Sequence, residues 1–273
     1  MKKKEKFRLF HSIKRGIYFF FIRVFRFGSF LISSHKSPKY LFILSPPYCG
    51  STMLNQLISS SKNVSCNNNL GTREGQLLPG VKHFMFQKDR WNPEVKYPWN
   101  KVKKVWTKYW DYSKPIFLDK SIPNIMRVDE IEKVFTPIKF ICLVRNPYAQ
   151  VEGIMRRNYQ DAKSAAEFAI KCLKYQSKNK LRENCLFFTY EDLCENGENV
   201  LKKMIRFVPE LSDMNINLEF TSHNFKENKK MKITNLNSEK ISKISDKDLS
   251  IINTIFISEK ALLKSFNYKI IER

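Results

Sequence analysis

The chain alternates short apolar runs with stretches of helical periodicity from Tyr40 to its C-terminus. The apolar runs predict strands at residues 40–44, 116–118, 140–144 and 186–189. The run FICLV at 140–144 is continuous, which is typical of a central strand buried on both faces. This alternation predicts an α/β fold, with a mostly parallel central sheet and helices on both faces.

Apolar residues at helical spacing follow these strands and predict the covering helices. The residues that mark the helices are Leu54, Leu57 and Ile58; Ile125, Val128, Ile131 and Phe135; Ala165, Phe168, Ala169, Cys172 and Leu173; Leu201, Met204, Ile205 and Val208; and Leu249, Ile252, Ile255 and Phe256. The sequence shows no internal repeat, so we expect one domain over residues 39–273.

Residues 1–38 form a separate basic and aromatic segment. Its apolar stretch, 17–32, contains Arg23 and Arg26, and each arginine near a bilayer centre costs roughly 2.5–3.5 kcal/mol, which disfavours a spanning helix. A helix here would separate the arginines from an apolar face, the pattern of a helix lying on an anionic membrane surface. That face would hold Ile17, Phe21, Val24, Phe25, Gly28 and Leu31. The alternative is that the aromatic face packs on the domain.

The net charge limits the classes of partner that we expect, and the cysteine content indicates the cellular compartment. The chain has 49 Lys and Arg against 26 Asp and Glu, and this net charge of +23 attracts phosphorylated cofactors, acidic glycans and anionic lipid. Nucleic acid is not expected, because the chain has no zinc-finger spacing, RNP motif or basic zipper. The six cysteines, without a CxxC pair, are expected to be reduced thiols of a cytoplasmic protein. Only Cys49 lies in a loop where a thiol could be exposed. The sequence carries no signal for an oligomeric state.

The loop after the first predicted strand reads SPPYCGST, from Ser45 to Thr52. Gly50, Ser51 and Thr52 would start the next helix, where unpaired N–H groups and the helix dipole favour an anion. The two hydroxyls can add donors or simply cap the helix. The first glycine and the lysine of the Walker A motif are missing, so a triphosphate with magnesium is not implied. We expect no metal site.

A second junction follows the strand at 140–144, where Arg145 precedes Asn146 and Pro147. Asn as N-cap and Pro in the first turn predict a helix start. A guanidinium at the carboxyl end of a central strand points into the crevice where open α/β sheets bind ligands, and it suits a phosphate. Arg156 and Arg157 follow on the same helix, with surface salt bridges as the alternative. Two such junctions suggest a ligand with two separated phosphate-type groups.

From Tyr40 to the C-terminus, the order of these motifs resembles the PAPS-dependent sulfotransferase superfamily, especially its bacterial and tyrosylprotein-sulfotransferase-like branches (PAPS is 3′-phosphoadenosine 5′-phosphosulfate). PPYCGST stands where the family has P-[RK]-[ST]-G-[ST]-T, LVRNP matches the R-[ND]-P signature, and YEDL at 190–193 is intact. The resemblance implies a P-loop-type three-layer sandwich, PAPS as co-substrate and sulfuryl transfer to a hydroxyl-type acceptor.

The resemblance also implies roles for single residues. Glu74, in TREGQLLPG, would be the general base, and Lys120, in FLDKSIP, would stabilise the sulfuryl group. The alternatives are a solvated carboxylate and a lysine paired with Asp119 or another acid. His83 and His223 are reserve bases. The implied cofactor-binding residues are Tyr48, Cys49, Gly50, Ser51, Thr52, Arg145, Gly153, Arg157 and Tyr190.

Two positions depart from the family pattern. Tyr48 stands where the family carries Arg or Lys, and Gly153 stands where it commonly carries serine. Nucleotide binding is therefore expected to be retained more securely than the full catalytic rate. A catalytically weak PAPS-binding protein is one rival function, and a basic membrane-surface module is another.

An aromatic run lies between Glu74 and Lys120, within a lysine-rich insertion. Aromatic faces stack on sugars and lysines attract acidic glycans, so this run predicts a lid over a carbohydrate acceptor. The alternative is that its tryptophans pack into the core. They are Trp91, Trp99, Trp106 and Trp110.

Overall fold

The computed structural model describes residues 2–33, 37–215, 217, 219–221 and 230–272. Side chains are described from residue 13 onward, apart from those at 221, 230 and 231. His223, one of the two reserve bases, lies outside the described residues.

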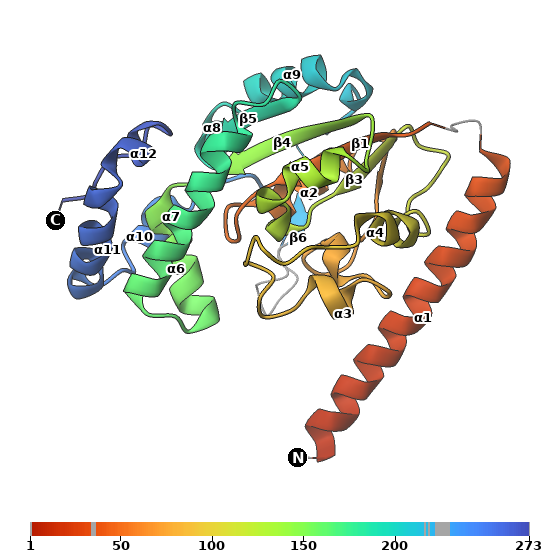
Figure 1. Cartoon of the computed structure of the whole chain (residues 1–273), viewed down its shortest axis with the longest axis horizontal. Helices are drawn as coiled ribbons and strands as arrows, with labels where there is room; N and C mark the ends of the chain where they lie inside the picture. The colour runs from red at the N-terminus through yellow and green to blue at the C-terminus, as the bar shows by residue number, and fades with distance from the viewer. Residues whose placement is uncertain (1, 34–36, 216, 218, 222–229, 273) are drawn as a thin grey trace.

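A parallel sheet in the order β2-β3-β1-β4-β5 forms the centre of the molecule (Figure 1). Its strands are β1 (Lys39–Leu44), β2 (Val64–Cys66), β3 (Ile116–Asp119), β4 (Ile138–Val144) and β5 (Cys185–Thr189). β1 pairs in parallel with β3, with Lys39 opposite Ile116, and with β4, with Tyr40 opposite Ile138. The predicted strands are confirmed, and β2 is an additional edge strand that the sequence did not reveal. A short antiparallel pair, β6 (Phe220–Thr221) and β7 (Lys230–Met231), forms a second sheet.

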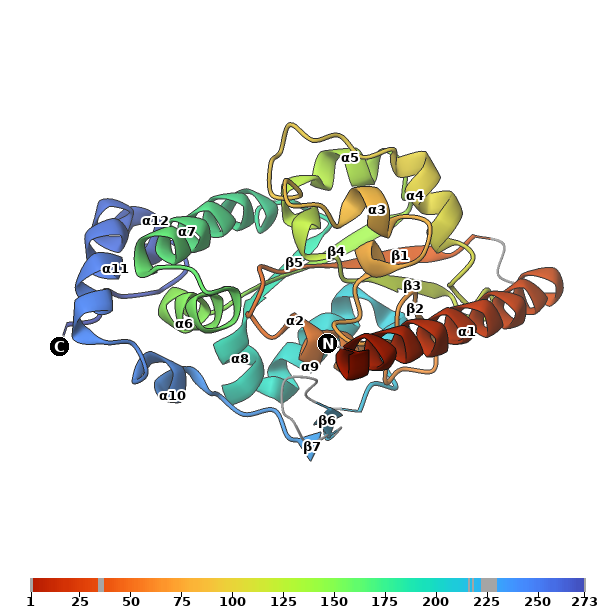
Figure 2. The ribbon, with the colours of Figure 1, turned by 90° about the horizontal axis from the view of Figure 1, so that it is seen from below.

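Helices cover both faces of the sheet, which confirms the three-layer prediction (Figure 2). Side chains alternate along β1, so Phe42 and Leu44 join one hydrophobic cluster and Leu41 and Ile43 join the other. The first face is covered by α3 (Lys82–Met85), α4 (Trp99–Trp106), α5 (Val128–Glu132) and α7 (Ala162–Asn179). The second face is covered by α2 (Ser51–Ile58), α8 (Tyr190–Glu195) and α9 (Gly197–Phe207).

The remaining elements flank these layers. A third hydrophobic cluster joins α6 and α7 to the C-terminal helices, and α1 runs along one side of the molecule (Figure 1). α6 begins as predicted, because the Asn146 side chain accepts a hydrogen bond from the N–H of Tyr148 (3.0 Å) and Pro147 occupies the first turn. The bounds are α1 (Lys2–Ile32), α6 (Pro147–Asn158), α10 (Asn237–Ile241), α11 (Asp246–Ser258), α12 (Lys260–Lys264), and the 3₁₀ turns η1 (Gly75–Leu77), η2 (Ile122–Met126) and η3 (Pro209–Leu211).

The prediction of an aromatic lid over the acceptor is wrong. Its alternative, that the tryptophans pack into the core, is confirmed. Trp99, Trp106 and Trp110 are buried in the cluster on the first face, and Trp91 packs edge-on against Phe168. The indole N–H of Trp106 donates to the carbonyl of Gly75 (3.2 Å). Trp106 therefore supports the loop around Gly75 from inside, and the run does not cover an acceptor.

The connectivity makes the carboxyl ends of β1 and β4 a topological switch point, the place where ligands bind in open α/β sheets. These strands are neighbours, yet α2, which follows β1, covers one face while α7, reached from β4 through α6, covers the other. Chains that leave adjacent strands toward opposite faces open a crevice that binds ligands in α/β sheets. The two anion-favouring junctions meet there.

Candidate active site

The loop of residues 45–50 joins β1 to α2 through two left-handed residues. Tyr48 has φ 66°, and Gly50, directly before α2, has φ 90°. A Cβ at Gly50 would lie 2.8 Å from the Tyr190 ring, so only glycine fits. The first hydrogen bond of α2 runs from the N–H of Leu54 to the carbonyl of Gly50 (3.1 Å), and the preceding N–H groups have no carbonyl one turn earlier. The predicted anion-favouring helix start is present.

The Tyr48 side chain lies over α6. Its hydroxyl donates to Oδ1 of Asn158 (2.8 Å), and its ring contacts the backbone of Gly153, where a Cβ would come within 2.9 Å of the ring base. Burial raises the pKa of Tyr48, and the charges of Arg157, Arg156 and Arg90 partly oppose this. Gly153 is therefore covered by Tyr48, while Arg157 is exposed near it.

The thiol of Cys49 lies inside this loop rather than at its surface. Its side chain is fully buried, its Sγ contacts the carbonyl oxygen of Pro47 (3.6 Å), and burial raises the pKa of the thiol to about 12. The expectation of an exposed thiol in this loop is wrong, because Cys49 points into the interior. All six cysteines are free.

Arg145 directly follows β4 and is buried. Its Nε donates to Oδ1 of Asn237 (2.6 Å), its Nη1 donates to the carbonyl of Tyr48 (3.3 Å), and its guanidinium stacks over the Tyr190 ring at 4.0 Å. Its Nη2 is buried and has no partner among the described residues. A buried N–H left without an acceptor is costly, so this atom suits a bound anion.

Glu191 and Asn237 hold this arginine and were missed by sequence reasoning. Asn237 receives Nε of Arg145 and itself donates to Glu191, whose carboxylate also accepts from the N–H of Asn146 (2.8 Å) and the hydroxyl of Tyr268 (3.1 Å). Glu191 belongs to the YEDL motif, which could have drawn attention to it. Asn237 carries no local signal, because its role depends on α10 packing against α6, which brings it to Arg145.

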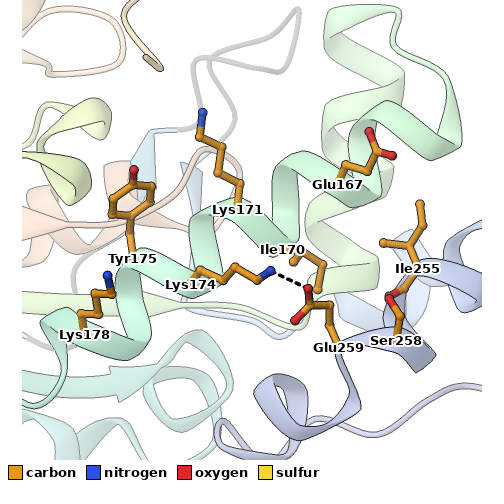
Figure 3. A pocket seen from close by; sticks show the side chains of 9 residues that line it. All are labelled: Glu167, Ile170, Lys171, Lys174, Tyr175, Lys178, Ile255, Ser258 and Glu259. Atoms are coloured by element: carbon orange, nitrogen blue, oxygen red, sulfur yellow. Dashed lines mark hydrogen bonds and ion pairs between the residues drawn. The ribbon is translucent and has the colours of Figure 1, made fainter. Parts of the chain in front are cut away.

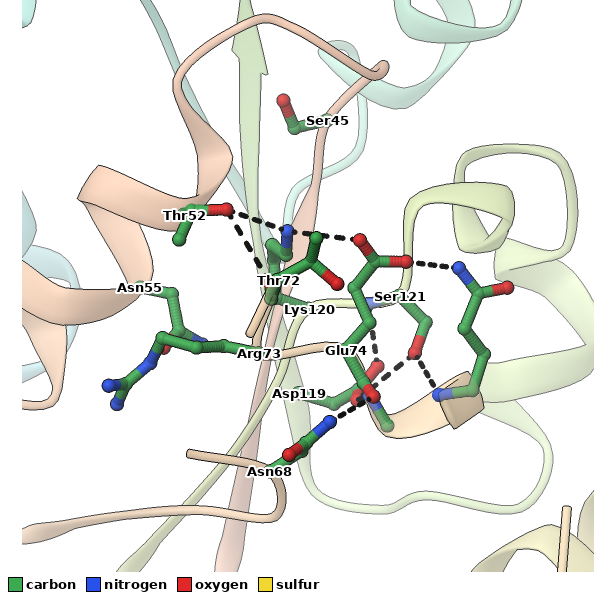
Figure 4. Close-up of polar contacts among 12 residues, drawn as sticks. Ser45, Thr52, Asn55, Asn68, Thr72, Arg73, Glu74, Asp119, Lys120 and Ser121 are labelled. Atoms are coloured by element: carbon green, nitrogen blue, oxygen red, sulfur yellow. Dashed lines mark hydrogen bonds and ion pairs between the residues drawn. The ribbon is translucent and has the colours of Figure 1, made fainter. Parts of the chain in front are cut away.

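Lys120 connects the anion loop to the predicted base (Figure 4). It follows β3 directly, is fully buried, and its Nζ lies 3.2 Å from Oγ1 of Thr52 and 3.5 Å from Oε1 of Glu74. The other carboxylate oxygen of Glu74 accepts from the amide of Gln76. Burial lowers the pKa of Lys120, and the Glu74 carboxylate opposes this. Glu74, Lys120 and Thr52 thus come from three separate segments and meet in one group, in which Glu74 and Lys120 are buried and Thr52 is half-buried.

Asp119 is not the partner of Lys120 but the support of the Glu74 loop. Its carboxylate accepts hydrogen bonds from the N–H of Gly75 (3.0 Å), the N–H of Ser121 (3.0 Å), and the amides of Asn67 (2.9 Å) and Asn124 (3.0 Å). Burial raises its pKa from 3.8 to about 6, although these hydrogen bonds pull in the opposite direction. A Cβ at Gly75 would lie 2.2 Å from this carboxylate. The loop is therefore fixed beside Lys120 by the residue that precedes Lys120.

Several other features lie outside this group. His83 is exposed and contacts Phe84 rather than the crevice. A hollow of about 650 Å³ lies between α7 and α11, where Lys174 pairs with Glu259 (Figure 3), and its lining contains none of the predicted site residues. The described part of the chain holds no cluster of three or more His, Cys, Asp or Glu suited to a metal ion. None of the described helices is both long and apolar enough to cross a membrane.

Comparison with known proteins identifies the family. Residues 38–210 match the sequence profile of the sulfotransferase family. No curated protein sequence matches the chain. Among solved structures, the chain is similar to the sulfotransferase domain of the Synechococcus olefin synthase (21% identity, TM-score 0.54, covering 87% of this chain and 98% of that one). It is also similar to a sulfotransferase from Alicyclobacillus acidocaldarius (10% identity, TM-score 0.51, covering 85% and 97%).

A mouse sulfotransferase complexed with PAP, the desulfonated form of PAPS, shows a weaker likeness, with 14% identity, a TM-score of 0.49, and coverage of 83% of this chain and 88% of that one. The profile match spans more than half of the chain. The chain therefore belongs to the sulfotransferase family, and it is an enzyme of the PAPS-dependent superfamily.

Proposed function

We propose that this enzyme moves the sulfuryl group of PAPS to a hydroxyl-type acceptor at the Glu74–Lys120 pair. The observation that carries the proposal is the position of the Lys120 ammonium, between Thr52 at the start of α2 and the Glu74 carboxylate. One group thereby borders both the anion-binding helix start and a carboxylate that can accept a proton. Sulfuryl transfer requires this combination of charge stabilisation and proton removal in one place.

The nucleotide would be held at two points of the crevice. The 3′-phosphate is assigned to Arg145, whose Nη2 has no partner within the described part of the chain and offers a charged hydrogen bond. The 5′-phosphosulfate is assigned to the helix start, where the N–H groups and hydroxyls of Ser51 and Thr52 follow Cys49 and Gly50. Tyr190 would hold the Arg145 guanidinium through the face of its ring. The ring is itself fixed, because its hydroxyl donates to the carbonyl of Thr234 (2.6 Å). Arg157 would add positive charge at the rim.

PAPS supplies the sulfuryl group, and the bond from its sulfur to the bridging oxygen breaks as a bond to the acceptor oxygen forms. Glu74 would take the acceptor's hydroxyl proton during this step. Its Oε1 faces Lys120 and its Oε2 accepts from Gln76, so one oxygen must be released before it can act. When Lys120 turns toward the sulfuryl oxygens, it would release Oε1. Binding of PAPS would thus free one carboxylate oxygen of Glu74 to accept the proton.

We propose a carbohydrate hydroxyl as the acceptor, supported by the net charge of +23, which attracts acidic glycans. The predicted aromatic lid, the second argument for a carbohydrate acceptor, does not apply, because its tryptophans pack into the core. The test is incubation with ³⁵S-labelled PAPS and a panel of acidic glycans, neutral sugars, tyrosine peptides and simple phenols. Labelled glycan supports the proposal, and label only on peptides or phenols rejects the carbohydrate class. PAP binding without any transfer would favour the rival function, a catalytically weak nucleotide-binding protein.

A further inference from the structure

One face of α1 is apolar, exposed and free of charged side chains along its central part. Its members recur at helical spacing and are between 52 and 72% exposed. We call this the outer face; its main residues are Ile17, Phe20, Phe21, Val24, Phe25 and Leu31. Exposed apolar surface of this extent on a soluble domain marks a contact with something else.

The opposite face of α1 is fastened to the domain. Phe19 is buried and meets the Tyr109 ring edge-on at 5.7 Å, and Arg26 forms an ion pair with Asp111. Ser29 accepts from the N–H of Tyr112 (3.2 Å). These contacts set the rotation of the helix about its axis, so the outer face is directed away from the protein. The alternative that the aromatic residues pack on the domain holds for Phe19 but not for the outer face.

Positive charge borders the outer face. Residues 1–38 contain ten Lys and Arg against a single Glu, and Lys14 is exposed three positions before Ile17, on the same side of the helix as Phe21. Arg15 and Arg23 are also exposed, nearer the domain, where the Arg15 guanidinium lies over the Phe19 ring at 5.5 Å. Apolar side chains flanked by cations match a bilayer surface of anionic lipid, whose acyl region receives the apolar face and whose headgroups pair with the cations. A second copy of the chain would instead bring two basic flanks together, which is unfavourable.

We infer that the outer face of α1 lies in the surface of an anionic membrane, parallel to its plane. The helix cannot also insert across the bilayer while Arg26 pairs with Asp111, because its other face is occupied by the domain. The enzyme would then work with its catalytic domain held at the lipid surface. This inference does not depend on the identity of the acceptor.

The test is co-sedimentation of the full-length protein with vesicles. We expect binding to vesicles of phosphatidylcholine and phosphatidylglycerol in equal parts, and much weaker binding to pure phosphatidylcholine. The double variant Phe21→Ser with Phe25→Ser should lose affinity for the anionic vesicles by at least about tenfold, because two aromatic side chains that would enter the lipid are removed. The matched control is Leu181→Ser with Ile257→Ser, at 79 and 58% exposed positions away from α1, which should bind as wild type.

Because all four substituted side chains are exposed, thermal unfolding should be close to wild type in both variants. The inference is wrong if the outer-face variant and the control bind anionic vesicles equally, or if charge in the lipid makes no difference. It is also wrong if the wild-type protein ignores vesicles and forms a dimer that the outer-face variant abolishes, since the occupant of this face would then be a second copy.

Discussion

Tyr48 and Gly153, the two positions at which the chain departs from the family pattern, are in direct contact. A Cβ on residue 153 would come within 2.9 Å of both Cβ and Cγ of Tyr48. The tyrosine thus requires a glycine beneath it, and the two departures form a single packing feature. Its hydroxyl is directed to Asn158 on α6. The cation that other family members place in this loop is therefore replaced by a ring that closes the loop against α6.

Gly153→Ala should destabilise the fold by about 1–3 kcal/mol, because the added methyl group overpacks against Tyr48. Glycine to alanine within a helix otherwise stabilises by roughly 0.5–1 kcal/mol. Gly16→Ala is the matched control, since no atom among the described residues lies within 4 Å of its Cβ position in α1. Urea denaturation should show opposite changes for the two variants. Tyr48→Gly should suppress most of the penalty of Gly153→Ala, and independent effects would contradict the contact.

Arg145→Ala should weaken PAP binding by about 1.5–3 kcal/mol, the range for a lost charged hydrogen bond. The PAP affinity of Arg145→Lys should lie between those of Arg145→Ala and wild type, because lysine keeps the charge but lacks the planar guanidinium. Arg182→Ala is the control, since Arg182 pairs with Asp129 and Glu132 on another surface. Isothermal titration calorimetry measures all three. Equal affinity of Arg145→Ala and wild type would exclude Arg145 from the nucleotide site.

The pH dependence of stability should reveal Asp119. Its folded pKa, about 6, is above the unfolded value of 3.8, so the stability it contributes is full below about pH 4 and is lost as the pH rises through about 6. The stability of wild type minus that of Asp119→Asn should therefore fall across this window, by on the order of 2–3 kcal/mol. Denaturation at a series of pH values measures the difference. A constant difference would show that Asp119 titrates normally.

Asp111 supplies the control of opposite sign. Burial acts to raise the pKa of Asp111, but hydrogen bonds from Ser113 and the charge of Arg26 leave it below its ordinary value. Its contribution should be present at neutral pH and lost as the pH falls below the ordinary range of aspartate. The stability of wild type minus that of Asp111→Asn should therefore decrease as the pH falls. Over the acid range the same difference for Asp119→Asn should increase.

Local sequence patterns predicted the parts of the fold that have a local cause. FICLV reads as a central strand because it is buried on both faces, and Arg145 was found because it follows that strand. β2 could not be found, since VSC has too few apolar residues to stand out and becomes a strand only by pairing with β3. The same holds for Asn237, whose contact with Arg145 spans 92 positions of sequence.

The resemblance to sulfotransferases selected Glu74 and Lys120, and the structure brings them together with Thr52. Their roles in transfer are proposals that rest on this geometry. The sequence indicates Asp119 only as a possible partner of Lys120, its neighbour in the chain. Its hydrogen bonds to Gly75 and Ser121 instead make it the support of both catalytic candidates.

Lys120→Met should slow transfer and weaken the affinity for PAPS more than that for PAP, since the lysine would contact the sulfuryl group in the bound donor. The matched variant is Lys180→Met, whose ammonium lies over the Phe266 ring on a distant surface. Quenched-flow single turnovers give the transfer rate, and competition calorimetry gives the two affinities. Equal losses of PAPS and PAP affinity would place Lys120 at the nucleotide instead of the sulfuryl group.

The most direct test of the proposed mechanism is single-turnover transfer by Glu74→Gln, with PAP affinity measured on the same protein. A general base contributes typically 100- to 10,000-fold to the rate, and Glu74 would not be needed to hold the nucleotide. We predict that Glu74→Gln binds PAP like the wild type and loses transfer by a factor in that range. Transfer at the wild-type rate with PAP affinity intact would contradict the assignment of Glu74 as the base.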